Sequence, residues 1–249
     1  MSIPGKEIIR VYDEYGPIQV FDDGNKRHLA FGTEDEQGCI LKSRPHQVQY
    51  AYIRAMLLHL LFDHTPENCL ILGLGSGGLA HALFHHLPST QVTVVELRQK
   101  VIELGYSHFQ LPRDDRLVLI QRDAGEYIRQ SDHTETFDVI YSDIYSSEGM
   151  DQQQTEALYI QGCLARLHPD GWLVINFWQE HRKLQFLALL KTYFSQVWVN
   201  SIDSGNWILM ASQNPQQLNK KQVKSAAKQL SVGFGFSFQQ SAAGLQLSL

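Results

Sequence analysis

Short apolar segments alternate with amphipathic stretches through the middle of the chain. Apolar runs of three to six residues bounded by turn residues predict strands at Cys69–Leu72, Val92–Val95, Leu117–Ile120, Val139–Tyr141 and Trp172–Phe177. Helical spacing lies between them, at Leu79–His86, Gln99–Phe109, Gly125–Arg129 and Gln154–Leu167. Such alternation predicts an α/β fold, with a parallel sheet that carries helices on both faces.

Two further strands complete the predicted sheet. A helix near Leu184–Thr192 precedes the apolar runs Val197–Asn200 and Trp207–Met210, which only a short turn around Gly205 separates. A tight link makes neighbouring strands antiparallel. We therefore expect a Rossmann-like sheet of seven strands, parallel except for one. The Lys-, Gln- and Ser-rich tail, residues 213–249, is expected to form one short helix and a loosely ordered end.

The N-terminal segment has a different pattern. Short β-type runs at Ile8–Tyr12, Ile18–Phe21 and His28–Phe31 alternate with turn residues, and Asp22 to Asn25 is a good hairpin turn. This predicts a small antiparallel β-domain over residues 1–47. A helix over Val48–Phe62 then opens a main domain over residues 48–212.

Composition narrows the class of protein. Hydrophobic residues make up 43% of the 249, enough for a substantial core, and the net charge of −5 argues against a nucleic-acid partner. Cys39, Cys69 and Cys163 show no disulfide or metal spacing, and Cys69 is expected to be a buried thiol. No signal peptide or membrane span is apparent, so a cytoplasmic location is expected.

A glycine-rich turn follows the first strand of the alternating region. Gly73, Gly75 and Gly78 fit the GxGxxG pattern between a strand and a helix, which is typical of nucleotide binding. Glu96 ends the next strand, where an acid usually accepts hydrogen bonds from ribose hydroxyls; a solvated strand end, with Arg98 beside it, is the alternative. At this point a nicotinamide cofactor and an S-adenosyl ligand are equally possible.

Two acids at later strand ends favour the S-adenosyl ligand. Asp123 is placed to receive an adenine amino group, although Asp-x-x-Glu also predicts a helix cap there. Asp143 ends the fourth strand, where catalytic groups concentrate in open α/β sheets. Together with the antiparallel strand pair, these acids indicate an adenosylmethionine-dependent transferase more than a dehydrogenase. His81 and His85 lie one helical turn apart with no third ligand, so we expect a helix surface and no metal.

The order of these motifs resembles that of spermidine synthase-like proteins, relatives of the polyamine aminopropyltransferases. The resemblance runs from about Ile8 to Met210 and rests on segments in the following order: Gly16–Val20, Phe31-Gly32, Tyr52–Met56, Leu72–Gly78, Val95-Glu96, Asp123-Ala124 and Asp143. It implies a β-domain on a Rossmann-like domain, often as a homodimer. It also implies transfer of an aminopropyl group from decarboxylated S-adenosylmethionine to a small-molecule amine, with release of methylthioadenosine.

The resemblance also assigns roles to residues. Asp143 matches the aspartate that orients and deprotonates the attacking amine. The donor is expected on Gln37, Gly73, Gly75, Ser76, Gly77, Glu96, Asp123 and Ala124, with Glu96 on the ribose and Asp123 on the adenine. The acceptor amine is expected near Tyr52, Tyr145 and Glu148. The last two, with Trp178, are candidates from the loop sequence and not from the resemblance: Tyr145 and Trp178 as pocket walls, with simple packing as the alternative, and Glu148 as negative charge, with a solvated loop residue as the alternative.

The amine end departs from the family pattern. Ser76 stands where the synthases have an aspartate that binds the donor ammonium, and Ile53-Arg54 replaces a His-Glu pair. Ser146 replaces a second aspartate in the loop after Asp143. Two alternatives therefore stay open. Ser76 mildly favours a methyltransferase that uses intact S-adenosylmethionine, whereas Arg54 and Ser146 favour a catalytically silent nucleoside-binding protein.

Overall fold

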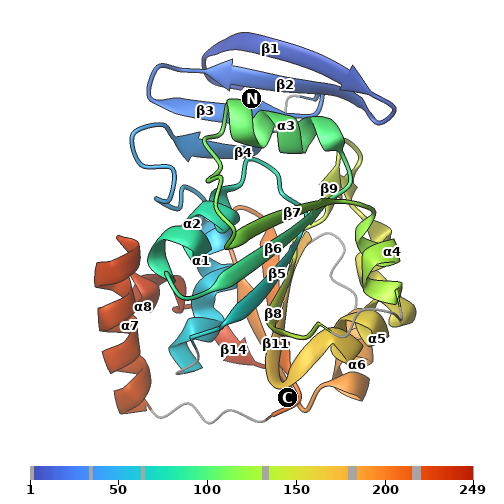
Figure 1. Cartoon of the computed structure of the whole chain (residues 1–249). Coiled ribbons are helices and arrows are strands. Elements are labelled where there is room, and N and C mark those ends of the chain that lie inside the picture. Colours follow the sequence, from blue (N-terminus) through green and yellow to red (C-terminus); the bar gives the residue numbers. More distant parts are fainter. Residues whose placement is uncertain are drawn as a thin grey trace.

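The protein is built on two sheets joined end to end (Figure 1). The computed structural model describes residues 3–33, 36–62, 65–130, 135–178, 184–214 and 220–248. The smaller sheet is an antiparallel meander in the order β1-β2-β3-β4, as the N-terminal turn pattern predicted. Its strands are β1 (Lys6–Asp13), β2 (Gly16–Asp22), β3 (Lys26–Ala30) and β4 (Glu36–Leu41).

The larger sheet has the order β14-β12-β13-β11-β8-β5-β6-β7. Strands β11, β8, β5, β6 and β7 are parallel, and β13 lies antiparallel between β11 and β12. Without β14 (Leu245–Leu247), which is an eighth strand, this is the predicted Rossmann-like arrangement of seven strands. The bounds are β5 (Asn68–Leu72), β6 (Gln91–Glu96), β7 (Leu117–Gln121), β8 (Phe137–Ser142), β11 (Leu167–Trp178), β12 (Gln196–Ser201) and β13 (Asn206–Ser212).

Each face of the larger sheet has its own apolar core. Successive side chains of a strand point to opposite faces, so Cys69 and Ile71 join one core while Leu70 and Leu72 join the other. The first core contains apolar residues of α1 (Ala51–Met56), the 3₁₀-helix η1 (Leu57–Phe62), α2 (Gly78–His86) and α3 (Gln99–Ser107). The second contains those of α4 (Ala124–Arg129), α5 (Ala157–Arg166) and α6 (Leu184–Tyr193).

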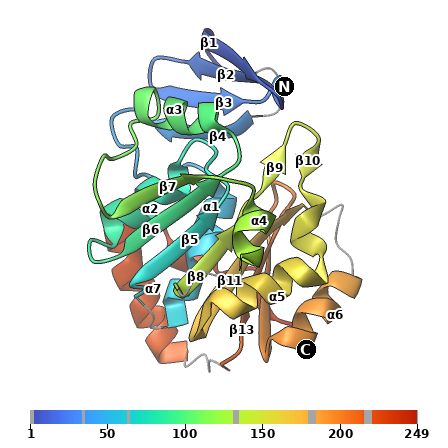
Figure 2. The same ribbon diagram turned by 45° about the vertical axis from the view of Figure 1, so that its right-hand side comes forward.

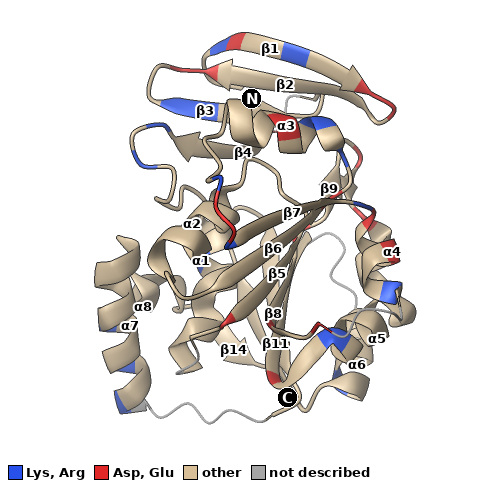
Figure 3. Ribbon diagram, in the orientation of Figure 1, with Lys and Arg blue, Asp and Glu red and all other residues tan. Residues whose placement is uncertain are grey.

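The C-terminal segment is more ordered than its composition predicted. Instead of one short helix and a loose end, it forms α7 (Lys220–Phe234), α8 (Phe238–Ser241) and β14 (Leu245–Leu247), which adds an eighth strand beside β12. Phe234 and Phe238 are buried in the first core and anchor the two helices. The many Lys and Gln residues of α7 hid this apolar face from a judgement by composition; the Lys residues are blue in Figure 3.

Two polar networks join the small N-terminal sheet to the main domain. Arg98, which follows β6, is buried and donates to both carboxylate oxygens of Asp13 at 2.7 and 2.9 Å and to the Gly16 carbonyl at 2.7 Å. Its guanidinium also lies 4.7 Å from the centre of the Phe31 ring. Glu96 and Arg98 are both buried, and Arg98 ties the main domain to β1. The alternative of a solvated strand end at Glu96 is therefore wrong.

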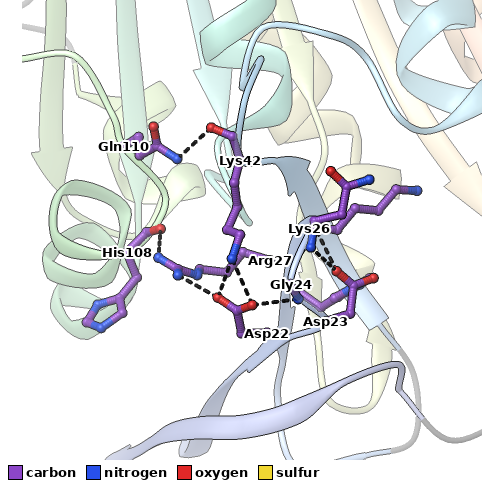
Figure 4. A network of polar contacts seen from close by, with 10 residues as sticks. Asp22, Asp23, Gly24, Lys26, Arg27, Lys42, His108 and Gln110 are labelled. Carbon is purple, nitrogen blue, oxygen red and sulfur yellow. Dashed lines mark hydrogen bonds and ion pairs between the residues drawn. The ribbon is translucent and has the colours of Figure 1, made fainter.

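A second network lies on the other side of the small sheet (Figure 4). The Asp22 carboxylate accepts from Arg27 at 2.6 Å and from Lys42 at 2.8 Å, and the Arg27 hydrogen bond is the main cause that holds the pKa of Asp22 below its usual range. Arg27 also donates to the His108 carbonyl beyond α3 at 2.8 Å. These contacts hold the small sheet against the segment that follows α3.

Among the described residues, no helix combines the length and the apolar character needed to cross a membrane.

Candidate active site

A cavity of about 650 Å³ opens at the carboxyl ends of β5, β6, β8 and β11. The start of β4 and the hairpin of β9 (Tyr145–Ser146) and β10 (Gly149–Met150) also contribute to its walls; both stand at this end of the sheet in Figure 2. Of the predicted site residues, all except Gly77 line the cavity: Gln37, Tyr52, Gly73, Gly75, Ser76, Glu96, Asp123, Ala124, Asp143, Tyr145 and Glu148. Gly77 instead precedes α2 as its N-cap, in the left-handed conformation with φ +79°.

The glycine turn lies directly against the strand end that carries Asp143. Gly73 has φ +94°, and its N–H donates to the Val95 carbonyl at 2.8 Å. A Cβ at Gly73 would lie 2.2 Å from the Asp143 carbonyl oxygen, and the Asp143 N–H donates to the Leu72 carbonyl at 2.9 Å. Only glycine permits this approach of two backbones, so the turn and the predicted catalytic acid are positioned together.

Glu96 is buried at the end of β6 and holds the turn in place. Its Oε2 accepts the Leu74 N–H at 2.9 Å, and its Oε1 accepts the Arg98 N–H at 2.8 Å. Burial raises the pKa of Glu96, and these backbone hydrogen bonds act in the opposite direction. The Leu97 N–H hydrogen-bonds the Glu96 carboxylate as well, and because a carboxylate has about four acceptor sites, the side chain is still able to accept a ribose hydroxyl.

Asp123 caps α4, as the Asp-x-x-Glu pattern predicted. Its Oδ1 accepts the Glu126 N–H at 2.9 Å, while its Oδ2 accepts from Gln153 Nε2 at 3.3 Å. Gln153 lies in the 3₁₀-helix η2 (Gln152–Thr155) and also donates to Asp151 at 2.9 Å. Because Asp123 also lines the cavity, the cap and the predicted adenine contact are compatible.

Asp143 stands at the end of a chain of oriented amides. Asn176 Nδ2 donates to Asp143 Oδ1 at 2.8 Å, Asn206 Nδ2 donates to Asn176 Oδ1 at 2.9 Å, and Ser204 Oγ donates to Asn206 Oδ1 at 2.8 Å. Tyr52 also hydrogen-bonds the Asp143 side chain. Burial raises the pKa of Asp143 to about 6, against the lowering effect of the Asn176 and Tyr52 hydrogen bonds. A carboxyl group that titrates there is suited to accept a proton near neutral pH.

Aromatic rings form the walls next to Asp143. The Tyr145 hydroxyl donates to the Asn176 carbonyl at 3.3 Å, and Trp178, at the end of β11, also lines the cavity. Glu148 lies at the exposed tip of the β9–β10 hairpin, and its N–H donates to Ser146 Oγ at 3.1 Å. Rings beside a carboxylate make a suitable environment for a cationic amine.

The charge reversal at Arg54 lies outside the cavity. Ile53 and Tyr52 face the cavity, whereas Arg54 donates to the Val48 carbonyl at 3.1 Å and lies 5.6 Å from the centre of the Phe236 ring. Arg54 thus contacts the C-terminal segment, and no positive charge enters the amine end from this position.

The histidine pair is only partly a surface feature. His85 is exposed, but His81 is buried and its Nε2 lies 2.7 Å from the Phe109 carbonyl, so the expected helix surface is wrong for His81. Within the described residues, one other group has metal-binding side chains close together: potential ligand atoms of His28, Glu36 and Cys39 lie within 4.8 Å of one another. Cys69 is a buried thiol, as expected.

The sequence interpretation missed Glu36, Gln153, Asn176 and Asn206. Asn176 carries a weak signal, since a lone amide in the apolar run Trp172–Phe177 needs a buried partner. The sequence places Asn206 in the short turn around Gly205, and only the pairing of β11 with β13 brings it beside Asn176. Gln153 lies in a polar stretch that carries no signal of its own.

Comparison with known proteins identifies the family. A sequence profile of the Spermine/spermidine synthase domain matches residues 51–222. The chain belongs to the spermine/spermidine synthase family. Among the relatives of this family member is a polyamine aminopropyltransferase of Neisseria meningitidis, 31% identical over 237 residues that cover 93% of this chain and 89% of the relative. The predicted resemblance and the prediction of a transferase enzyme are thereby confirmed.

Solved structures support the fold of this family member. A probable spermidine synthase from Corynebacterium glutamicum has a TM-score of 0.76 at 21% identity, over 99% of this chain and 91% of that one. Human methyltransferase-like protein 13, solved in complex with SAH, has a TM-score of 0.63 at 24% identity, over 77% of this chain and 92% of that one. These two likenesses concern the fold alone, which the probable spermidine synthase and the methyltransferase-like protein share.

Proposed function

We propose that the protein transfers the aminopropyl group of decarboxylated S-adenosylmethionine to a small amine. The observation that carries this proposal is the position of Asp143, beside Tyr52 and Asn176, in the same cavity as the glycine turn, Glu96 and Asp123. The nucleoside is expected on Glu96 and Asp123, and the amine between Asp143 and the rings of Tyr145 and Trp178. Family membership supports the same reaction class.

In the proposed step, the amine nitrogen attacks the propyl carbon that is bonded to the sulfonium sulfur. The new C–N bond forms as the C–S bond breaks, its electron pair returns to sulfur, and methylthioadenosine leaves as a neutral thioether. The attacking amine must lose one proton, which passes to the Asp143 carboxylate. The sulfonium is already a good leaving group, so the protein contributes mainly position and proton acceptance.

The direct test offers the purified protein decarboxylated or intact S-adenosylmethionine with a panel of small amines. Mass spectrometry then identifies the products. Methylthioadenosine together with an aminopropylated amine supports the proposal. A methylated amine and S-adenosylhomocysteine would establish the methyltransferase alternative instead. Binding of methylthioadenosine without turnover of either donor would support the silent nucleoside-binding protein.

The pKa of Asp143 predicts the pH dependence of kcat/KM. The carboxylate form is required, so activity should fall as the pH drops below about 6. Asn176→Ala removes a hydrogen bond that lowers this pKa, and the acid limb of the profile should therefore move to higher pH. Steady-state rates between pH 4.5 and 9 measure the shift, on the scale of about one unit expected for one lost hydrogen bond. An acid limb that stays in place in Asn176→Ala would argue against Asp143 as the titrating group.

A further inference from the structure

The neutral glycine turn lies directly under the start of β4. A Cβ at Gly38 would lie 2.5 Å from Ser76 Oγ, and a Cβ at Gly75 would lie 3.6 Å from the Gln37 carbonyl oxygen. Ser76 is buried by this contact. The close approach leaves little room for an acid at position 76. Glu36, which precedes Gln37 at the start of β4, lines the same cavity.

The other acids of the cavity have different hydrogen-bond partners from those of Glu36. Glu96 is bound by backbone N–H groups, Asp123 and Asp151 cap helices, and Asp143 is held by Asn176 and Tyr52. Glu148 stands on the exposed hairpin.

One oxygen of Glu36 contacts His28 Nδ1, and its side chain remains 26% exposed toward the cavity. His28 is itself buried, and its Nε2 lies 3.4 Å from Asp23 Oδ2. The Tyr50 hydroxyl and the Cys39 thiol also hydrogen-bond the Glu36 side chain. These neighbours hold the Glu36 carboxylate at the cavity wall, where its exposed part can meet a ligand.

We propose that Glu36 binds the terminal ammonium of the donor side chain, supplying from β4 the negative charge that Ser76 does not supply from the turn. This assignment rests on the proposed function and deepens it. A carboxylate at this place attracts a propyl chain that ends in an ammonium, and it repels a donor that still carries its own carboxylate. Glu36 is then the residue that selects the decarboxylated donor over intact S-adenosylmethionine.

The same residues offer a second interpretation, in which His28, Glu36 and Cys39 hold a metal ion. A metal would need the Cys39 thiolate. Cys39 is buried, and its thiol already has hydrogen-bond partners in Tyr50 and Glu36, which a metal would have to displace. We therefore argue for the ammonium site and treat metal binding as an outcome of the test.

The test compares three ligands on the wild type and on Glu36→Gln by isothermal titration calorimetry in the presence of EDTA. Loss of a charge-assisted hydrogen bond should weaken binding of decarboxylated S-adenosylmethionine about 10- to 100-fold. Methylthioadenosine, which has no ammonium, should bind both proteins within about twofold. Intact S-adenosylmethionine should bind Glu36→Gln as tightly as the wild type or more tightly. Opposite effects on the two donors would not follow from a loss of structure.

Glu103→Gln is the matched control. It removes a carboxylate that forms an exposed ion pair with Lys100 and is not among the residues that line the cavity. It should leave all three affinities unchanged. Equal weakening of all three ligands in Glu36→Gln, or no change in the donor preference, would overturn the assignment while leaving the proposed function intact. In a separate titration of the wild type without EDTA, stoichiometric Zn²⁺ binding that blocks the decarboxylated donor would overturn it in favour of a metal site. A wild type that binds methylthioadenosine but not the decarboxylated donor would overturn both.

Discussion

Asp143→Asn is expected to lower kcat/KM for aminopropyl transfer by about 10²- to 10⁴-fold, the usual range for loss of a general base. The amide has nearly the same shape and still meets Tyr52, but it cannot take the proton of the attacking amine. Steady-state rates measured by release of methylthioadenosine give the size of the loss. The acid limb of the pH profile near 6 should disappear in the residual activity.

Two measurements separate this effect from a structural one. Methylthioadenosine should bind Asp143→Asn within about twofold of the wild type, because Glu96 and Asp123 are untouched. Asp114→Asn, an equivalent change at an exposed site whose carboxylate contacts only nearby Arg116, should retain full activity. A fully active Asp143→Asn enzyme would remove the proposed role as base and leave the proton to solvent.

Gly73→Ala should lose both stability and nucleoside binding. The residue has φ +94°, and the added methyl carbon would lie 2.2 Å from the Asp143 carbonyl oxygen, so one of the two backbones has to move. Strain of this kind, on top of the left-handed conformation, should lower the free energy of unfolding by more than about 2 kcal/mol. Binding of methylthioadenosine should weaken at least tenfold, since the turn that contacts the ligand is displaced. Urea unfolding and calorimetry measure the two effects.

The chain offers a control that isolates the clash from the conformational strain. Gly24 has a similar φ of +86°, but nothing lies within 4 Å of a Cβ at that position. Gly24→Ala should therefore cost about 1–2 kcal/mol through strain alone and should leave ligand binding unchanged. Equal losses of stability in the two variants, with nucleoside binding retained in Gly73→Ala, would show that the contact between the turn and Asp143 is not needed.

The sequence predicted the site best where functional residues follow directly on strands that the apolar pattern defines. The strands of a parallel sheet are apolar on both faces, so the alternation from Cys69 to Phe177 defined the sheet, and acids at strand ends pointed to one edge of it. Glu96, Asp123 and Asp143 accordingly meet in one cavity. Asp123 also shows that two interpretations of one residue can be compatible, because a helix cap leaves the side chain at the cavity wall.

Partners far apart in the chain were not predictable in this way. Arg98 lies beside Glu96 and another cation in sequence, which indicates solvent, yet its partner Asp13 is 85 residues away on the small sheet. Arg54 likewise appeared to reverse the charge of the site, but α1 turns it toward Phe236. Both errors have one cause: a single sequence shows which residues are charged, but only the packing of elements shows which way a long side chain extends.

The pairing of β14 with β12 has a consequence for the order in which the protein is made. Until residues 245–247 have been synthesised, the backbone of β12 from Trp198 to Asn200 is an edge with open hydrogen-bonding groups. A chain that stops short of Leu245 exposes this edge, and one that stops before Phe234 also leaves open the apolar surface that Phe234 and Phe238 cover in the full chain. Premature termination in this region therefore yields a chain with a sheet edge free to pair with its neighbours, which makes aggregation of the truncated product the expected fate.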